Sequence, residues 1–425
     1  MTVEQPHGPW FNWKSNELYV EGVSLAEIAR QVGTPTYVYS RSALEERFTA
    51  LSKSLESTRH LICYSVKANS NLAVLRTFAR LGSGFDIVSA GELYRVQCAG
   101  GSLSSVVYSG VGKTEDEVRA ALKAGILFFN AESLAELELL ERVAAERGQQ
   151  APVALRINPD VDPKTHPYIA TGLRKSKFGI PMSHALEAYD YARRFCHLRI
   201  VGLDCHIGSQ LTDLAPFRDA LERIRGLWER LCKAGYEIQY IDVGGGLGIR
   251  YRDENPPSFA DYADVLTRSL QPFAGTVVLE PGRSLVGNAG ALLTRVQYLK
   301  NSGEKNFVIV DAAMNDLIRP SLYGAYQEIV PVFARPGEPV TVDVVGPVCE
   351  SGDFLARDRS LPAVRPGDLL AVMSAGAYGF VMASNYNARP RAAEVLVDGD
   401  RFSVVRARET YADLTRGETI PAWLE

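Results

Sequence analysis

The chain has 425 residues, 46% of them hydrophobic, and a formal net charge of −4 with acidic and basic residues mixed along its length. This composition predicts a soluble globular protein with more than one core, and it shows no basic stripe for nucleic acid and no polybasic segment for a membrane surface. No run of about 18 apolar residues and no signal-peptide pattern is present, so we expect a cytoplasmic protein with a small-molecule partner.

The six cysteines are scattered along the chain, at positions 63, 98, 196, 205, 232 and 349. They show neither the CxxC nor the CxxH spacing of zinc sites, and they do not form the dense framework of a disulfide-stabilised domain. We therefore predict reduced thiols, most of them packed in the core, and no metal site.

Residues 36–290 alternate short apolar runs with helical patterns, which is typical of βα units around a parallel sheet. Eight strands are predicted, at 61–66, 84–89, 105–110, 126–130, 153–158, 199–205, 240–244 and 276–280. Amphipathic helices lie between them, for example at 133–148 and 217–235, and both of these patterns close on glycine. Eight units favour a TIM-type (β/α)8 barrel, although an open doubly wound sheet would show the same local alternation.

The pattern changes after residue 290. Segments such as NFVIVDAA and VTVDVVGPV read as strands punctuated by Gly, Pro and Asp, with few helical patterns between them. Residues 291–425 are therefore predicted to form a second, mostly β domain, and residues 1–35 are expected to join it. The fold class is α/β, with a barrel at 36–290.

Chemically active side chains follow several of the predicted barrel strands. They are Lys67 after the first strand, Asp86 within the second, Asn130 at the end of the fourth, His206 after the sixth, Gly244, Gly245 and Gly246 after the seventh, and Glu280 at the end of the eighth. In a (β/α)8 barrel such positions line the active site. An amine, a flat imidazole, a glycine loop and a carboxylate are the groups that pyridoxal 5'-phosphate needs.

Each of these residues also has an ordinary structural explanation. Lys67 can cap its strand in solvent, and a glycine run often only permits a tight turn. His206 can be a hydrogen-bonded buried histidine, and Glu280 can pair with Arg283, three residues further on. GGGLG matches neither the dinucleotide fingerprint nor the Walker pattern, so the residues alone leave these alternatives open.

Nine segments in series resemble the diaminopimelate decarboxylase family, which belongs to the alanine racemase-like fold class of pyridoxal phosphate enzymes. They are YSVKANSN, GSGFDIVSAGEL, NPDVDPKTHPYIATGLRKSKFGI, HIGSQL, DVGGGLGI, EPGRSLVG, MNDLIRPSLYGAY, GPVCESGD and GAYGFVMASNYNARPR, and they extend from about residue 18 to 415. The resemblance implies a barrel that binds pyridoxal 5'-phosphate, a β domain that completes the active site, and a homodimer with shared active sites. The implied reaction is decarboxylation of meso-2,6-diaminopimelate to L-lysine and CO2, the last step of lysine biosynthesis.

The resemblance also implies roles for individual residues. Lys67 binds the cofactor covalently, and Cys349 is the proton donor, reaching in from the partner subunit. Further cofactor-binding residues are Asp86, His206, Ser209, Gly244, Gly245, Gly246, Glu280, Pro281, Gly282, Arg283 and Tyr378. Within that set, Asp86 orders the surroundings of the lysine, His206 stacks on the cofactor ring and Glu280 faces the pyridine nitrogen.

The implied substrate-binding residues are Arg283, Arg319, Tyr323, Glu350 and Tyr378. A substrate with an amino acid group at both ends needs cations for its carboxylates and an anion for its remote ammonium, and Arg283, Arg319 and Glu350 supply both signs. An isolated arginine is more often part of an ordinary ion pair, so this assignment depends on the series of motifs.

Other functions on the same fold are alternatives to this one. A decarboxylase for ornithine, arginine or a carboxylated polyamine would act on substrates without the second amino acid end. A racemase would use a tyrosine base and a different pyridine partner. A non-catalytic cofactor-binding barrel generally lacks the β domain that carries Cys349, Glu350 and Tyr378 here.

Overall fold

The computed structural model describes residues 8–162, 165–166, 169, 171–172 and 176–424. Residues 1–7 of the predicted N-terminal segment and parts of the motif at 158–180 lie outside these ranges. The chain divides into two compact units, one comprising Leu44–Val286 and the other Met1–Ala43 with Gly287–Glu425. The division into domains at 1–35, 36–290 and 291–425 stays a prediction.

Parallel strands of the unit Leu44–Val286 form a closed barrel. In spatial order they are β9 (Ala151–Asn158), β11 (Leu198–Asp204), β12 (Tyr240–Asp242), β13 (Thr276–Leu279), β5 (His60–Ser65), β6 (Gly84–Ile87), β7 (Val106–Tyr108) and β8 (Phe128–Ala131). The pairing of β8 with β9 closes the ring, and the short β10 (Ile180–Pro181) adds to β9. This closure confirms the predicted barrel and excludes the open sheet.

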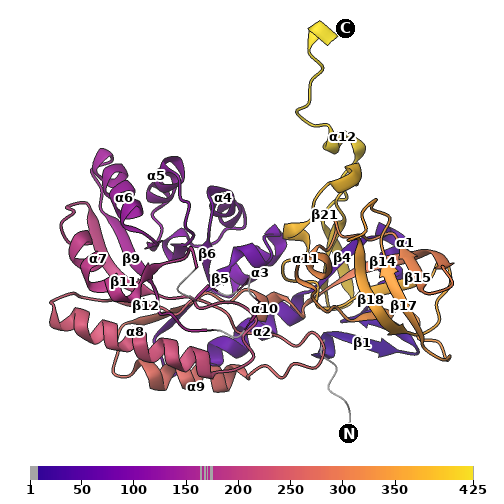
Figure 1. Ribbon diagram of the computed structural model, residues 1–425, viewed down its shortest axis with the longest axis horizontal. Coiled ribbons are helices and arrows are strands. Elements are labelled where there is room, and N and C mark those ends of the chain that lie inside the picture. The colour runs from indigo at the N-terminus through magenta and orange to yellow at the C-terminus, as the bar shows by residue number, and fades with distance from the viewer. Residues whose placement is uncertain (1–7, 163–164, 167–168, 170, 173–175, 425) are drawn as a thin grey trace. The chain divides into compact units, whose positions relative to one another are not determined.

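Helices form the outer layer of the barrel, as Figure 1 shows for α4 to α9. They are α2 (Arg41–Ser54), α3 (Leu72–Arg80), α4 (Ala90–Cys98), α5 (Glu115–Ala124), α6 (Leu134–Glu146), α7 (Ala185–Ala192), α8 (Ala215–Lys233) and α9 (Phe259–Leu270). The short α10 (Arg283–Val286) follows β13, and its four residues are buried. Side-chain oxygens of Ser89, Thr114 and Ser133 cap α4, α5 and α6 by accepting a backbone N–H of the first turn. Each cap gives a partner to a backbone N–H group that has none within the helix.

The barrel interior is apolar in one layer and polar where the strands end. Cys63, Val107, Phe128, Ala154, Val201 and Val278 pack together as a buried cluster. By contrast, β8 carries the fully buried Asn130 near its carboxyl end, and the last residues of β11 and β12 are Asp204 and Asp242. A polar carboxyl end above an apolar layer is the arrangement in which this fold places active sites.

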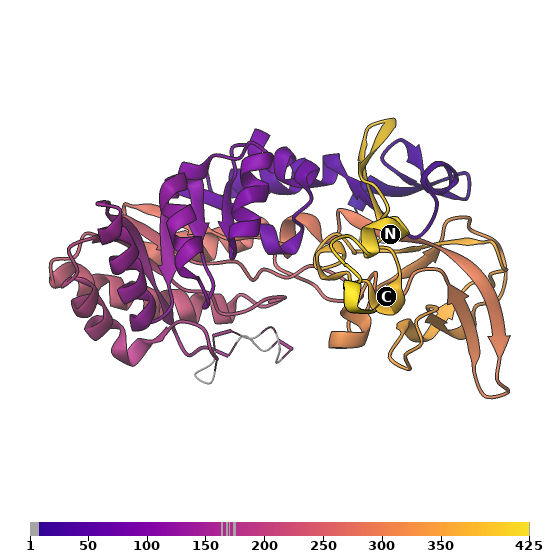
Figure 2. The same cartoon turned by 90° about the horizontal axis from the view of Figure 1, so that it is seen from above.

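The other unit is mostly β, as predicted. Its main sheet has the order β18 (Phe354–Leu361), β17 (Val340–Val345), β15 (Asn306–Val310), β14 (Gly290–Asn301), β4 (Thr36–Ser40), β20 (Ala393–Asp398) and β21 (Arg401–Arg406), while β19 (Leu369–Val372) joins β14 to β16 (Ile329–Pro331). The unit also contains β1 (Phe11–Lys14), β2 (Glu17–Val20), β3 (Val23–Ser24), α1 (Leu25–Val32), α11 (Arg319–Tyr323) and α12 (Tyr411–Leu414). Figure 2 shows β14 and β15, in orange, as a long antiparallel ribbon of this unit.

The described N-terminal residues pack with the β unit. Leu18 donates its backbone N–H to the carbonyl of Val332 at 2.8 Å, and Phe11 and Ile28 join the same buried cluster as Val395. The strand β4, which the predicted boundaries assign to the barrel, lies between β14 and β20. None of the described helices is both long and apolar enough to span a bilayer.

Candidate active site

The carboxyl ends of the barrel strands bring many of the predicted site residues into one unit. Those in Leu44–Val286 are Lys67, Asp86, His206, Ser209, Gly244, Gly245, Gly246, Glu280, Pro281, Gly282 and Arg283. Those in the β unit are Arg319, Tyr323, Cys349, Glu350 and Tyr378.

Lys67 lies in a single 3-10 turn, Val66–Ala68, directly after β5. Its Nζ donates to Oδ2 of Asp86 at 2.8 Å, and its side chain stays 38% exposed while that of Asp86 is fully buried. Ser65 donates to the same Oδ2. Among the described residues, the buried Oδ1 of Asp86 has no hydrogen-bond partner. The buried Asp86 carboxylate therefore binds the Lys67 amine, which stays accessible.

Glu280 follows β13 and is buried. Its Oε1 accepts a hydrogen bond from Ser109 at 3.0 Å and from the Asn130 amide at 3.3 Å. Burial first, and then the nearby Asp86 carboxylate, raises the pKa of Glu280 to about 7. The carboxyl group is therefore poised to share a proton with a basic nitrogen near neutral pH.

His206 is held by the glycine loop. Its Nδ1 accepts a hydrogen bond from the N–H of Gly245 at 3.1 Å, which assigns the ring proton to Nε2. Burial first, and then the charges of Arg156 and Lys67, lower the pKa of His206 well below its ordinary value. The ring is therefore a neutral, flat group, which suits stacking against another ring.

The glycines at 244–246 are required by close packing. A Cβ on Gly245 would lie 2.2 Å from the carbonyl oxygen of Glu280, and one on Gly246 would lie 2.6 Å from that of Gly208. Gly244 has a φ of 65°, in the left-handed region. The N–H of Gly244 donates to Asp242, and that of Gly245 donates to His206. These two glycines therefore shape the loop, and their N–H groups are not its donors to a phosphate.

Arg283 lies in a buried polar cluster. Its guanidinium donates to Oη of Tyr251 at 2.7 Å and to Oγ of Ser209 at 3.1 Å. Glu280 accepts from Ser109 and Asn130, so these contacts do not support the alternative of an isolated Glu280–Arg283 pair. A buried guanidinium beside a hydroxyl is a suitable site for an anionic oxygen.

Sequence reasoning missed Tyr251 and Arg156. No motif marks Tyr251, which lies in the loop after the glycines. Arg156 lies in the buried strand β9, and it donates to Glu132 at 2.9 Å. Arg156 could have been found from the sequence by the same pattern as Lys67, which is a cation in an apolar run, here VALRIN.

Within the β unit, Arg319 is buried and Tyr323 is half-buried, at the two ends of α11. Cys349 and Glu350 are exposed in the turn between β17 and β18, and Tyr378 is half-buried with a φ of 54°. The N–H of Cys349 donates to Asn387 at 2.7 Å. Cys349 is therefore not packed inside this unit. Within the two units, Cys63 and Cys205 are buried but Cys98, Cys196, Cys232 and Cys349 are exposed, so the prediction that most of the cysteines pack in the core is wrong.

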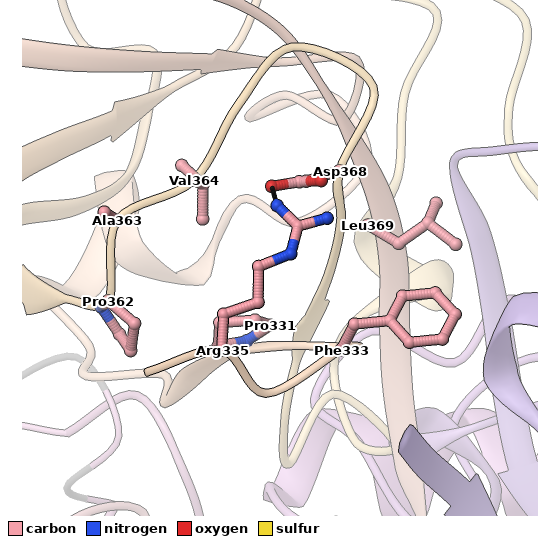
Figure 3. Close-up of a pocket in the computed structure, with 8 residues that line it drawn as sticks. All are labelled: Pro331, Phe333, Arg335, Pro362, Ala363, Val364, Asp368 and Leu369. Atoms are coloured by element: carbon pink, nitrogen blue, oxygen red, sulfur yellow. Dashed lines mark hydrogen bonds and ion pairs between the residues drawn. The ribbon is translucent and has the colours of Figure 1, made fainter. Parts of the chain in front are cut away.

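A cavity in the β unit is too small for a cofactor. Figure 3 shows it lined by Pro331, Phe333, Arg335, Pro362, Ala363, Val364, Asp368 and Leu369. Its volume of ≈ 10 Å³ leaves room for about one water molecule, and Arg335 pairs with Asp368 at 2.8 Å along its wall. Across the described residues, no group of His, Cys, Asp and Glu is arranged to hold a metal ion.

The barrel residues fit pyridoxal phosphate. They offer an accessible amine, a buried carboxylate oxygen without a partner among the described residues, a neutral imidazole, a carboxyl group that titrates near neutrality and a glycine loop without room for side chains. The family model "Pyridoxal-dependent decarboxylase, pyridoxal binding domain" matches residues 41–287. The class of the chain is therefore that of the pyridoxal-dependent decarboxylases.

Comparison with individual proteins narrows this class. A diaminopimelate decarboxylase of Pseudomonas aeruginosa is 58% identical over 410 residues, which cover 96% of this chain and 99% of the relative. The solved diaminopimelate decarboxylase of Helicobacter pylori complexed with L-lysine is 43% identical, with a TM-score of 0.89 over 92% of this chain and 98% of that one. That of M. jannaschii in co-complex with L-lysine is 38% identical, with a TM-score of 0.94 over 99% and 100% of the two chains. The chain belongs to the diaminopimelate decarboxylase family.

Proposed function

We propose that this enzyme decarboxylates meso-2,6-diaminopimelate to L-lysine and CO2, with pyridoxal 5'-phosphate bound at Lys67. The observation that carries the proposal is the Lys67 amine at the carboxyl end of a barrel strand, held by the buried Asp86. The names of the similar proteins support the substrate, and two solved relatives contain L-lysine, which is the proposed product.

The proposed cofactor residues surround Lys67 in the barrel unit. Glu280 faces the pyridine nitrogen, and His206 stacks on the ring. Ser209, Gly246, Pro281, Gly282 and Arg283 hold the phosphate, while Gly244 and Gly245 shape the loop and Asp86 orders Lys67. When bound, pyridoxal phosphate supplies an electron sink for the pair released as the Cα–carboxylate bond breaks.

The remaining chemistry belongs to side chains of this chain. Glu280 shares a proton with the pyridine nitrogen, which its pKa of about 7 permits at neutral pH. Arg283 and Arg319 bind substrate carboxylates, Glu350 binds the remote ammonium, and Tyr323 and Tyr378 complete the substrate contacts. Cys349 delivers the proton to the carbon that has lost CO2.

The proposal includes a homodimer in which each active site draws residues from both subunits. The exposure of Cys349 and Glu350 in one turn supports the sharing of active sites, because both side chains have to reach a substrate that is bound in the partner subunit. The expectation of a cytoplasmic enzyme stays a prediction, supported by six free cysteines and tested by cell fractionation.

Product analysis tests the proposal directly. Purified protein with added pyridoxal phosphate is incubated separately with meso-diaminopimelate, ornithine, arginine and a carboxylated polyamine, with Lys67→Ala as the control. We expect CO2 and L-lysine in equal amounts from meso-diaminopimelate, and neither from the control. A preference for one of the other substrates would replace our assignment, and absence of CO2 from all of them would remove decarboxylation.

A further inference from the structure

Asn130 lies at the centre of a buried polar network that the proposed function does not use. It is fully buried near the carboxyl end of β8, and its Nδ2 lies 3.3 Å from Oε1 of Glu280 and 3.2 Å from Oδ2 of Asp242. Ser109 lies 3.1 Å from the same nitrogen and donates its own proton to Glu280 at 3.0 Å. Oε1 of Glu280 therefore faces two donors, one in β8 and the other directly after the neighbouring strand β7.

Asp242 connects this network to the glycine loop. It is fully buried at the end of β12, and its Oδ1 accepts the N–H of Gly244 at 2.9 Å. Its Oδ2 is the oxygen that faces Asn130, and the N–H of Glu280 donates to the carbonyl of Gly244 at 2.8 Å. A continuous series of hydrogen bonds thus runs from the loop through Asp242 and Asn130 to the Glu280 carboxyl group.

We propose that Asn130 is a positioning residue, which orients the Glu280 carboxylate, favours its charged form and leaves Oε2 for the cofactor nitrogen. Asp242 in turn fixes the Asn130 amide. This inference rests on the proposed function, in which Glu280 faces the pyridine nitrogen. An amide suits the position because its N–H groups can donate to both carboxylates, whereas a third carboxylate there would repel them.

The charges around Glu280 explain why it needs such donors. The ionisable groups that act on it are Lys67, Asp86, Arg156, Asp204 and Asp242. Burial has the largest effect on the pKa of Glu280, and the Asp86 carboxylate adds to it, while Lys67 and Arg156 oppose it. Burial also raises the pKa of Asp204 and of Asp242 well above the ordinary value, so the surroundings favour the protonated form of Glu280. Hydrogen bonds to an ionised carboxylate favour its charged form and oppose this effect.

Titration of the cofactor-free protein tests the inference without relying on turnover. Infrared spectra of protein with 13C-labelled glutamate carboxyls give the Glu280 midpoint, which is assigned by its loss in Glu280→Gln. In Asn130→Ala we expect this midpoint to rise by about one unit, because a hydrogen bond to a charged group contributes roughly that much. Asn130→Ser, a smaller change in polarity, provides a second variant if the alanine variant does not fold.

Ser83→Ala is the matched control. The Ser83 hydroxyl is buried in the same barrel and donates to the backbone carbonyls of Ile62 and Gly84. Its loss should lower the melting temperature without moving the Glu280 midpoint. A midpoint in both Asn130 variants equal to that of the unsubstituted protein would overturn the inference.

The holoenzyme separates this inference from the proposed function. If Asn130→Ala raises the Glu280 midpoint but the unsubstituted enzyme releases no CO2 from meso-diaminopimelate, the proposed function fails while the positioning role is supported. If both hold, we expect Asn130→Ala to retain borohydride labelling of Lys67, with kcat reduced about tenfold and its pH profile shifted upward. An unshifted profile would contradict the positioning role.

Discussion

Nζ of Lys67 lies 2.8 Å from Oδ2 of Asp86, and the lysine side chain is 38% exposed while the aspartate is fully buried. The contact explains why a charged residue follows the buried strand β5. Asp86 fixes the amine from the inside of the barrel, and the exposed side of the lysine remains available to a carbonyl compound. This arrangement gives Lys67 both a fixed position and access.

Replacing Asp86 by Asn keeps the side-chain shape and removes its charge. We expect kcat/KM to fall about 10- to 100-fold, because a charge-assisted hydrogen bond contributes about 1.5–3 kcal/mol and each 1.4 kcal/mol is a factor of ten. Steady-state kinetics measure the change. Ser65→Ala, which removes only the hydroxyl that donates to Asp86, should have a smaller effect, and equal kinetics for Asp86→Asn and the unsubstituted enzyme would remove Asp86 from this role.

Glu280→Gln should change how the stability of the cofactor-free protein depends on pH. Folding raises the pKa of Glu280 from 4.5 to about 7. As the pH rises through 4.5 the unfolded chain loses this proton while the folded protein keeps it, so Glu280 destabilises the fold increasingly up to pH 7 and fully above it. The difference corresponds to at most about 3 kcal/mol.

Removing the titrating group should therefore raise the free energy of unfolding by up to about 3 kcal/mol at pH 8 and by almost nothing at pH 4. Denaturant unfolding at the two pH values measures this. The same variant should lose most of its turnover, since an amide cannot support a protonated pyridine nitrogen. An equal stability change at both pH values would show that Glu280 titrates normally in the fold.

Gly245→Ala should damage the cofactor loop. The added Cβ would lie 2.2 Å from the carbonyl oxygen of Glu280, and overpacking of this kind typically costs about 1–3 kcal/mol. We expect a lower free energy of unfolding and weaker binding of pyridoxal phosphate, measured by denaturation and fluorescence titration. Gly226→Ala is the control, since Gly226 lies within the helix α8 with nothing within 4 Å of its Cβ position, and alanine there should stabilise by about 0.5–1 kcal/mol. Unchanged cofactor affinity in Gly245→Ala would contradict the assigned role of the loop.

Mixing two inactive variants tests whether the active sites are shared. Lys67→Ala and Cys349→Ala should each have little activity, and Cys349→Ala should keep the cofactor absorbance. After subunit exchange at equal amounts, half of the dimers carry one intact site of two, so about a quarter of the full activity should return. Cys98→Ala, at another exposed cysteine, should be fully active alone. A mixture no more active than its components would place Lys67 and Cys349 in the same subunit's site or remove Cys349 from the reaction.

Much of the barrel could be predicted from the sequence because each βα unit carries its own local pattern. The predicted run 153–158 lies within β9, and the predicted helix 217–235 largely coincides with α8. Strand β4 (Thr36–Ser40) falls within the predicted barrel range 36–290, although it is not one of the eight predicted strands. Its partners β14 and β20 are distant in sequence, and only the folded chain reveals them.

Some features of the site could likewise be predicted from the sequence, and others could not. Lys67 and the glycines at 244–246 stand out as interruptions at the ends of apolar strands. The contact of Asn130 with Glu280 joins residues 150 positions apart, and that of Arg283 with Tyr251 depends on the course of a loop without a motif. Hydrogen bonds of this kind arise from barrel closure, so a pattern of local periodicity does not contain them.

Borohydride reduction of the cofactor-bound enzyme, followed by peptide mapping with mass spectrometry, tests the central claim most directly. We predict a single pyridoxyl group on Nζ of Lys67, and its loss when meso-diaminopimelate is present during reduction, because the substrate amine then takes the place of the lysine. A pyridoxyl group on another lysine such as Lys113, or a purified protein that binds no pyridoxal phosphate, would contradict the account.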